Sequence, residues 1–162
     1  MKYLLDTHAF LWSVTQSKAL PEKVLSELKN PHNEVFISAV SFWEIAIKTR
    51  IKKLDLGGLP MEDLISLAEK MDFQLIDLTP EEASTYVNLA ENTHNDPFDR
   101  MLIWQCIRRN MTIVSKDGEF EKFKDFGLKI LWSNELTNGF RPGFNFWTGD
   151  QDWQDRQEQP LS

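Results

Sequence analysis

The chain has 162 residues, of which 41% are hydrophobic and 27% charged, and its formal net charge is −7 at pH 7. This length and composition are typical of one soluble globular domain, and the single cysteine excludes an internal disulfide or a cysteine-based zinc cluster. The negative net charge argues against a protein that binds nucleic acid through a broad basic surface.

Short apolar runs rich in β-forming residues alternate with segments of helical period along the whole chain. In the helix expected after the second strand, Val40, Trp43, Ile47 and Ile51 fall on one side. The alternation favours an α/β fold, a parallel sheet of about five strands flanked by helices. In chain order the expected elements are strand 2–5, helix 7–14, helix 21–30, strand 34–38, helix 39–54, helix 61–71, strand 73–78, helix 81–92, helix 97–110, strand 111–115 and strand 128–132.

The two ends of the chain carry their own signals. Asp6 and His8 interrupt the apolar N-terminus too early for a signal peptide. No apolar run reaches membrane-spanning length, so we expect a cytoplasmic protein. The alternation stops after Trp132, so we divide the chain into a domain at 1–134 and an aromatic, acidic tail at 135–162. This tail could be mobile or could dock on the domain or on a partner.

Four acidic residues lie at or beyond the carboxyl ends of predicted strands. Asp6 directly follows the first strand, Asp117 lies two residues beyond 111–115, and Glu44 lies in the helix after the second strand. Asp99 stands in the first turn of the helix that leads to the fourth strand. Ligands of an open parallel sheet bind at this edge, so we expect the four carboxylates to converge.

Each acid also has a purely structural interpretation. Asp6 can cap the following helix, Asp117 and Gly118 suit a turn, and Glu44 completes a capping-box spacing with Ser41, although Ser38 is the better cap.

The stretch "HNDPFDR" at 94–100 sets two aspartates around a proline. Asp96 is interpreted as a helix N-cap, Pro97 as the first helical residue, and Asp99 as the third position of a capping box.

No histidine joins the acids by spacing, because His32 and His94 fall in predicted loops and His8 is interpreted as a packed or capping residue. An oxygen-only ligand set suits Mg²⁺ or Mn²⁺. Such cations would also compensate the mutual repulsion of clustered carboxylates and the acidity of the chain.

Four stretches, "LLDTHAFLW", "ISAVSFWEIAIK", "DPFDRMLIWQC" and "IVSKDGEF", together resemble the PIN-domain ribonucleases, specifically the toxins of VapBC-type toxin–antitoxin modules. They occur in the family's order between about residues 2 and 132. The resemblance implies a three-layer PIN-like fold and a metal-dependent endoribonuclease that hydrolyses RNA phosphodiester bonds. It also implies a cognate antitoxin and a homodimer.

The resemblance further implies roles for individual residues. Asp6, Glu44, Asp99 and Asp117 would be the catalytic acids that hold Mg²⁺ or Mn²⁺. Asp96 would keep its role as a helix cap and could also contact a ligand, and Thr7 and Ser115 would orient the neighbouring acids. Lys48, Arg100 and Lys116 would contact the RNA backbone, although they could equally be ordinary solvated charges.

Two alternatives remain open at this stage. A receiver-type signalling module also places acids and Mg²⁺ at strand ends, but it needs paired acids after the first strand, where Asp6 is followed by Thr7. A catalytically inactive PIN fold would act only as a binding partner.

Overall fold

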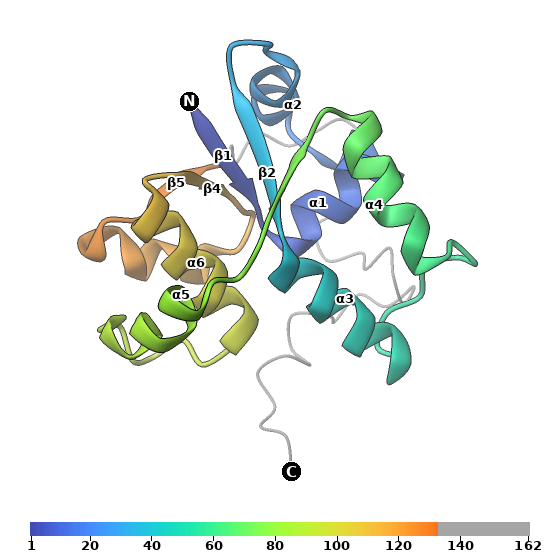
Figure 1. Ribbon diagram of the computed structural model, residues 1–162. Helices are drawn as coiled ribbons and strands as arrows, with labels where there is room; N and C mark the ends of the chain where they lie inside the picture. The colour runs from blue at the N-terminus through green and yellow to red at the C-terminus, as the bar shows by residue number, and fades with distance from the viewer. Residues whose placement is uncertain (133–162) are drawn as a thin grey trace.

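The computed structural model describes residues 1–132, which form a five-stranded sheet in the order β3-β2-β1-β4-β5 with every neighbouring pair parallel (Figure 1). All five predicted strands are confirmed. The predicted boundary at residue 134 and the tail 135–162 lie outside the described residues. The strands are β1 Lys2–Leu5, β2 Glu34–Ser38, β3 Gln74–Ile76, β4 Thr112–Val114 and β5 Lys129–Leu131.

Helices cover both faces of the sheet, as the α/β interpretation predicts. Helices α1, α2 and α4 lie on one face, and α5 and α6 lie on the other together with η3, a 3₁₀ helix (Figure 1). The helical bounds in residues 1–132 are α1 Thr7–Thr15, η1 Ser17–Ala19, α2 Glu22–Lys29, α3 Ala39–Arg50, α4 Met61–Lys70, α5 Pro80–Thr85, η2 Tyr86–Asn88, α6 Pro97–Arg109 and η3 Gly118–Phe126.

The central strand feeds two separate hydrophobic cores. Successive side chains of a strand point to opposite faces. Tyr3 and Leu5 therefore enter the core beneath α1, α2 and α4, while Leu4 enters the core beneath α6 and η3. Helix α3 contributes to both cores through Ile45 and Val40. This helix thus lies across the carboxyl edge of the sheet, where the candidate acids were expected.

Helix α3 differs from the prediction in length and in the face that it buries. It ends at Arg50, and Lys52 just beyond it takes a left-handed φ of 60°. Of the predicted apolar side, Val40 is buried, whereas Trp43 is 60% exposed and Ile51 52% exposed. The buried face also carries Glu44 and Ile45, which places a carboxylate inside the molecule.

Two further segments depart from the predicted helices. Helix α5 ends at Thr85 and gives way to a short 3₁₀ turn, so it is about half as long as predicted. The segment from Gly118 to Phe126, for which we predicted only a turn, is a nine-residue 3₁₀ helix with Phe120 and Phe123 buried. No helix within residues 1–132 combines the length and the apolar composition needed to cross a bilayer.

Candidate functional site

Strand β1 delivers Asp6 to the centre of the carboxyl edge, at the point where the strand order reverses. Its backbone N–H donates to Val114 of β4, and its Oδ1 accepts from the N–H of Ala9 at 2.8 Å, so the residue caps α1. Asp6 is only 5% exposed. Burial raises the pKa of this carboxyl to about 7; hydrogen bonds from Ser115 and Ala9 oppose the rise, and the nearby Glu44 and Asp117 charges add to it.

Helix α3 brings Glu44 beside Asp6. Glu44 is 2% exposed, and its Oε1 accepts a hydrogen bond from the Thr7 hydroxyl at 2.5 Å. Its Oε2 pairs with Lys48 one turn later on the same helix. Ser38 caps this helix by accepting from the N–H of Val40, as predicted. Glu44 is therefore held from two sides and is not needed as a cap.

The two aspartates of the 94–100 stretch have different environments. Oδ1 of Asp96 accepts from the N–H groups of Phe98 and Asp99 at 2.9 and 3.0 Å, and this carboxylate caps α6. Asp99 makes no such bond and lies toward the other acids. Burial, together with the charges of Asp96, Glu44 and Asp6, raises the pKa of Asp99, and a hydrogen bond with His94 opposes the rise.

The segment after β4 supplies Ser115 and Asp117. The Ser115 hydroxyl, which is buried, accepts from the N–H of Asp117 at 3.1 Å and hydrogen bonds to the Asp6 side chain. Asp117 caps η3 by accepting from the N–H of Glu119 at 2.9 Å. Ser115 thus links the acids that follow the two central strands.

His94 joins these acids, contrary to our expectation that no histidine would. Its Nε2 lies 3.1 Å from Oδ2 of Asp99. A ring nitrogen of His94 and carboxylate oxygens of Asp99 and Asp117 all lie within 4.8 Å of one another. The spacing of residues in the sequence could not predict the contact between His94 and the acids, because the position of a loop side chain depends on the interactions that hold its backbone.

Arg100 holds that backbone. Its guanidinium donates to the carbonyls of Leu89, Glu91 and His94 and to the hydroxyl of Tyr86, and the residue is 9% exposed. Four of its five N–H groups are engaged within the chain, an arrangement that does not fit the predicted role in RNA binding. Of the other predicted contacts, Lys116 is exposed beside Asp117, and Lys48 is partly buried in its pair with Glu44.

Negative charge gathers at this edge, where Lys48 pairs with Glu44 and His94 with Asp99. Asp6 interacts with the charges of Glu44 and Asp117, and Asp99 with those of Glu44 and Asp6. Carboxylates whose pKa is raised by burial and by like charges need protons or cations to balance them. Their oxygen donors are those that Mg²⁺ and Mn²⁺ prefer, so the residues present fit a divalent ion.

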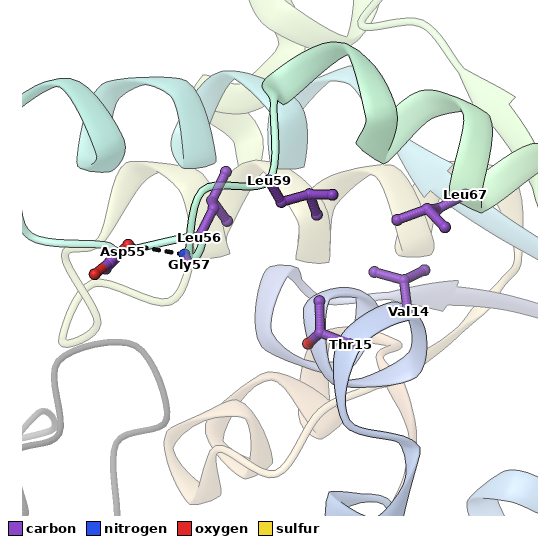
Figure 2. A pocket seen from close by; sticks show the side chains of 7 residues that line it. All are labelled: Val14, Thr15, Asp55, Leu56, Gly57, Leu59 and Leu67. Atoms are coloured by element: carbon purple, nitrogen blue, oxygen red, sulfur yellow. Dashed lines mark hydrogen bonds between the residues drawn. The ribbon is translucent and has the colours of Figure 1, made fainter.

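A separate pocket of about 450 Å³ lies between the end of α1, the loop after α3, and α4 (Figure 2). Leucine and valine side chains contribute most of its wall. Its one acid, Asp55, accepts from the N–H of Gly57 at 2.8 Å (Figure 2). None of the four acids lines this pocket, which therefore contributes nothing to the site at the sheet edge.

The family model described as "PIN domain" matches residues 3–125 of this chain. A sequence comparison with curated proteins found no match.

Among solved structures, VapBC2 from Rickettsia felis, bound to a DNA fragment from its promoter, is similar with a TM-score of 0.58 at 18% identity, over 82% of this chain and 100% of that chain. VapBC-1 from nontypeable Haemophilus influenzae has a TM-score of 0.53 at 17% identity, over 81% and 97%. A domain of a functionally unknown Methanocaldococcus jannaschii protein has a TM-score of 0.51 at 14% identity, over 86% and 96%. At identities this low, the similarity of the structures establishes a shared fold and nothing more.

Proposed function

The chain belongs to the PIN-domain family, and from this membership we propose that it is a metal-dependent endoribonuclease and the toxin of a type II toxin–antitoxin pair. PIN domains are nucleases, so membership of this family assigns the chain to the hydrolases. One observation supports the metal dependence: the carboxylates of Asp6, Glu44, Asp99 and Asp117 gather at one edge of the sheet, where burial and like charges raise the pKa of Asp6 and of Asp99. The receiver-type alternative has no support from the family.

In the proposed reaction these four carboxylates would hold Mg²⁺ or Mn²⁺ beside the scissile phosphodiester. The ion, when bound, would supply Lewis acidity and positive charge at the phosphate and at the attacking water. The protein's own task would be to hold the oxygen ligands in place. The Thr7 hydroxyl would do this for Glu44 and the Ser115 hydroxyl for Asp6, through hydrogen bonds that each fix one carboxylate.

Cationic groups near the acids would hold the RNA backbone. Lys116 adjoins Asp117 and is exposed, and Arg50, Lys52 and Lys53 are exposed at the end of α3. Phosphate contacts of this kind position a strand without reading its sequence. Such a local basic rim around an acidic centre would allow an acidic protein to bind RNA.

The proposed partners are an antitoxin and a second copy of the chain. Their support is the resemblance of four ordered stretches to VapBC toxins, together with the fold shared with two VapBC structures. Of the described residues, none identifies the surface that an antitoxin would cover.

A cleavage assay with purified full-length chain tests the proposed activity. RNA should be cut with added Mg²⁺ or Mn²⁺, should stay intact with excess chelator, and should be cut again when the metal is restored. Asp6→Asn should abolish cleavage, whereas the matched substitution Asp55→Asn, at an exposed acid of the separate pocket, should not. Chelator-resistant cleavage, or cleavage by Asp6→Asn, contradicts the proposal.

The partner is tested by expression in the native host. Co-purification should recover a second, smaller protein with the tagged chain, and adding that protein to the assay should suppress cleavage. Recovery of the chain alone, with full activity, contradicts the toxin–antitoxin assignment.

A further inference from the structure

His94 is held more firmly than an ordinary loop residue. Its backbone N–H donates to Glu91 at 3.1 Å, and its carbonyl accepts from Arg100 at 3.0 Å. Its ring packs in T-shaped contacts with Phe120 and Phe123, with each pair of ring centroids 6.0 Å apart. Backbone and ring are both fixed, so the direction of the imidazole is set by the fold.

The same elements position the acids that face this imidazole. Helix α6 carries Asp99 one residue before the arginine that holds the loop. Asp117 caps helix η3, which carries both phenylalanines that contact the ring. The imidazole and the two carboxylates are therefore located by a common framework of α6, η3 and the loop that Arg100 holds.

The three groups lie close enough together to be ligands of one ion. For bonds of about 2.1 Å, adjacent ligand atoms of an octahedral ion lie about 3 Å apart and opposite ones about 4.2 Å apart. His94 Nε2 and Asp99 Oδ2 are 3.1 Å apart, and all three donors fall within 4.8 Å. A simple histidine–aspartate pair would account for the first distance, but it would not require Asp117 as a third donor.

We propose that His94 is a nitrogen ligand in a divalent-ion position completed by Asp99 and Asp117, and that this position prefers first-row transition ions such as Mn²⁺ to Mg²⁺. The inference rests on the proposed metal-dependent function and refines its ligand set. Mg²⁺ favours all-oxygen coordination, whereas imidazole is a good ligand for borderline metals. Asp99 would connect this position to Asp6 and Glu44, whose charges it also feels.

Electron paramagnetic resonance of bound Mn²⁺ tests this directly in the full chain. Protein labelled with ¹⁵N only in histidine should show a nitrogen coupling to Mn²⁺ that changes between ¹⁴N and ¹⁵N samples. His94→Asn should lose the coupling and weaken Mn²⁺ binding by at least about 10-fold, with a smaller effect on Mg²⁺. The matched control is His32→Ala, in an exposed loop before β2, which should keep both the coupling and the affinity.

A second variant keeps the test decisive if His94→Asn does not fold. His8→Asn combined with His32→Ala leaves only one histidine in the chain, so a retained coupling assigns the ligand to His94. Mn²⁺ that binds without any histidine coupling overturns the inference while leaving the proposed nuclease function intact. Absence of both Mn²⁺ binding and chelator-sensitive cleavage overturns the proposed function and the inference with it.

Discussion

The paired aspartates of the 94–100 stretch offer the sharpest test of the site, because a single substitution in each should affect a different property. Asp96→Ala removes the acceptor for two backbone N–H groups of α6. Loss of an N-cap costs about 1 kcal/mol. For a chain of 162 residues this lowers the melting temperature by about 2–4 °C.

Asp99→Asn should instead leave stability nearly unchanged and abolish most of the activity. The amide has almost the same shape, and it removes a charge that its buried neighbours repel, so the melting temperature of the metal-free protein should stay level or rise. Cleavage should fall by at least about 1,000-fold if Asp99 is a metal ligand whose loss removes several kcal/mol of transition-state stabilisation.

Thermal unfolding followed by circular dichroism and a metal-dependent cleavage assay measure the two properties on the same preparations. Asp96→Ser is the matched control, since serine is also a good N-cap and should restore the lost stability. An Asp96→Ala protein that is inactive but fully stable, beside an Asp99→Asn protein that is active but less stable, would refute the division of roles.

Three further predictions concern individual side chains at the site and away from it. Between its ordinary pKa of 3.8 and its folded value of about 7, Asp6 binds more protons in the folded than in the unfolded state. In the presence of chelator, the free energy of unfolding relative to that of Asp6→Asn should therefore fall as pH rises from 5 to 7. Urea unfolding measures both proteins, and a free-energy difference that rises with pH would refute this. Thr7→Val, which loses the hydrogen bond to Glu44, should slow cleavage about 10–100-fold, and Thr7→Ser should restore the rate. Glu82→Ala leaves Arg109 without its buried partner and should lower the free energy of unfolding by about 3 kcal/mol. Glu81→Ala breaks an exposed pair and should lower it by only about 0–1 kcal/mol. Chemical unfolding measures both variants, and equal losses would contradict this reasoning.

The fold was predictable because its main signals are local. Strands and helices were recognised from short apolar periods, and the edge that gathers the acids follows from where parallel strands end. Asp6 directly follows a strand and Asp117 nearly does, so their proximity could be expected before any coordinates were known.

The rest depended on interactions that leave little trace in side-chain patterns. The imidazole of His94 is placed by an arginine that binds backbone carbonyls, and carbonyls are common to every residue. A period of 3.6 does not predict helix η3, because Phe120, Phe123 and Phe126 repeat every three residues, as in a 3₁₀ helix. An apolar stripe does not predict the exposure of Trp43, because the neighbouring Glu44 carboxylate takes the buried position.

The first strand of the described residues, β1, is also the middle one of the sheet. Its two neighbours begin at Glu34 and Thr112, so its second hydrogen-bonded flank stays open until more than one hundred residues have been made. Asp6 therefore meets Asp117 only after the crossover from β3 to β4 has closed. Pairings so distant along the chain fold slowly. A nascent or truncated polypeptide ending before residue 117 cannot assemble the centre, so any hydrolytic capacity arises only in the finished domain.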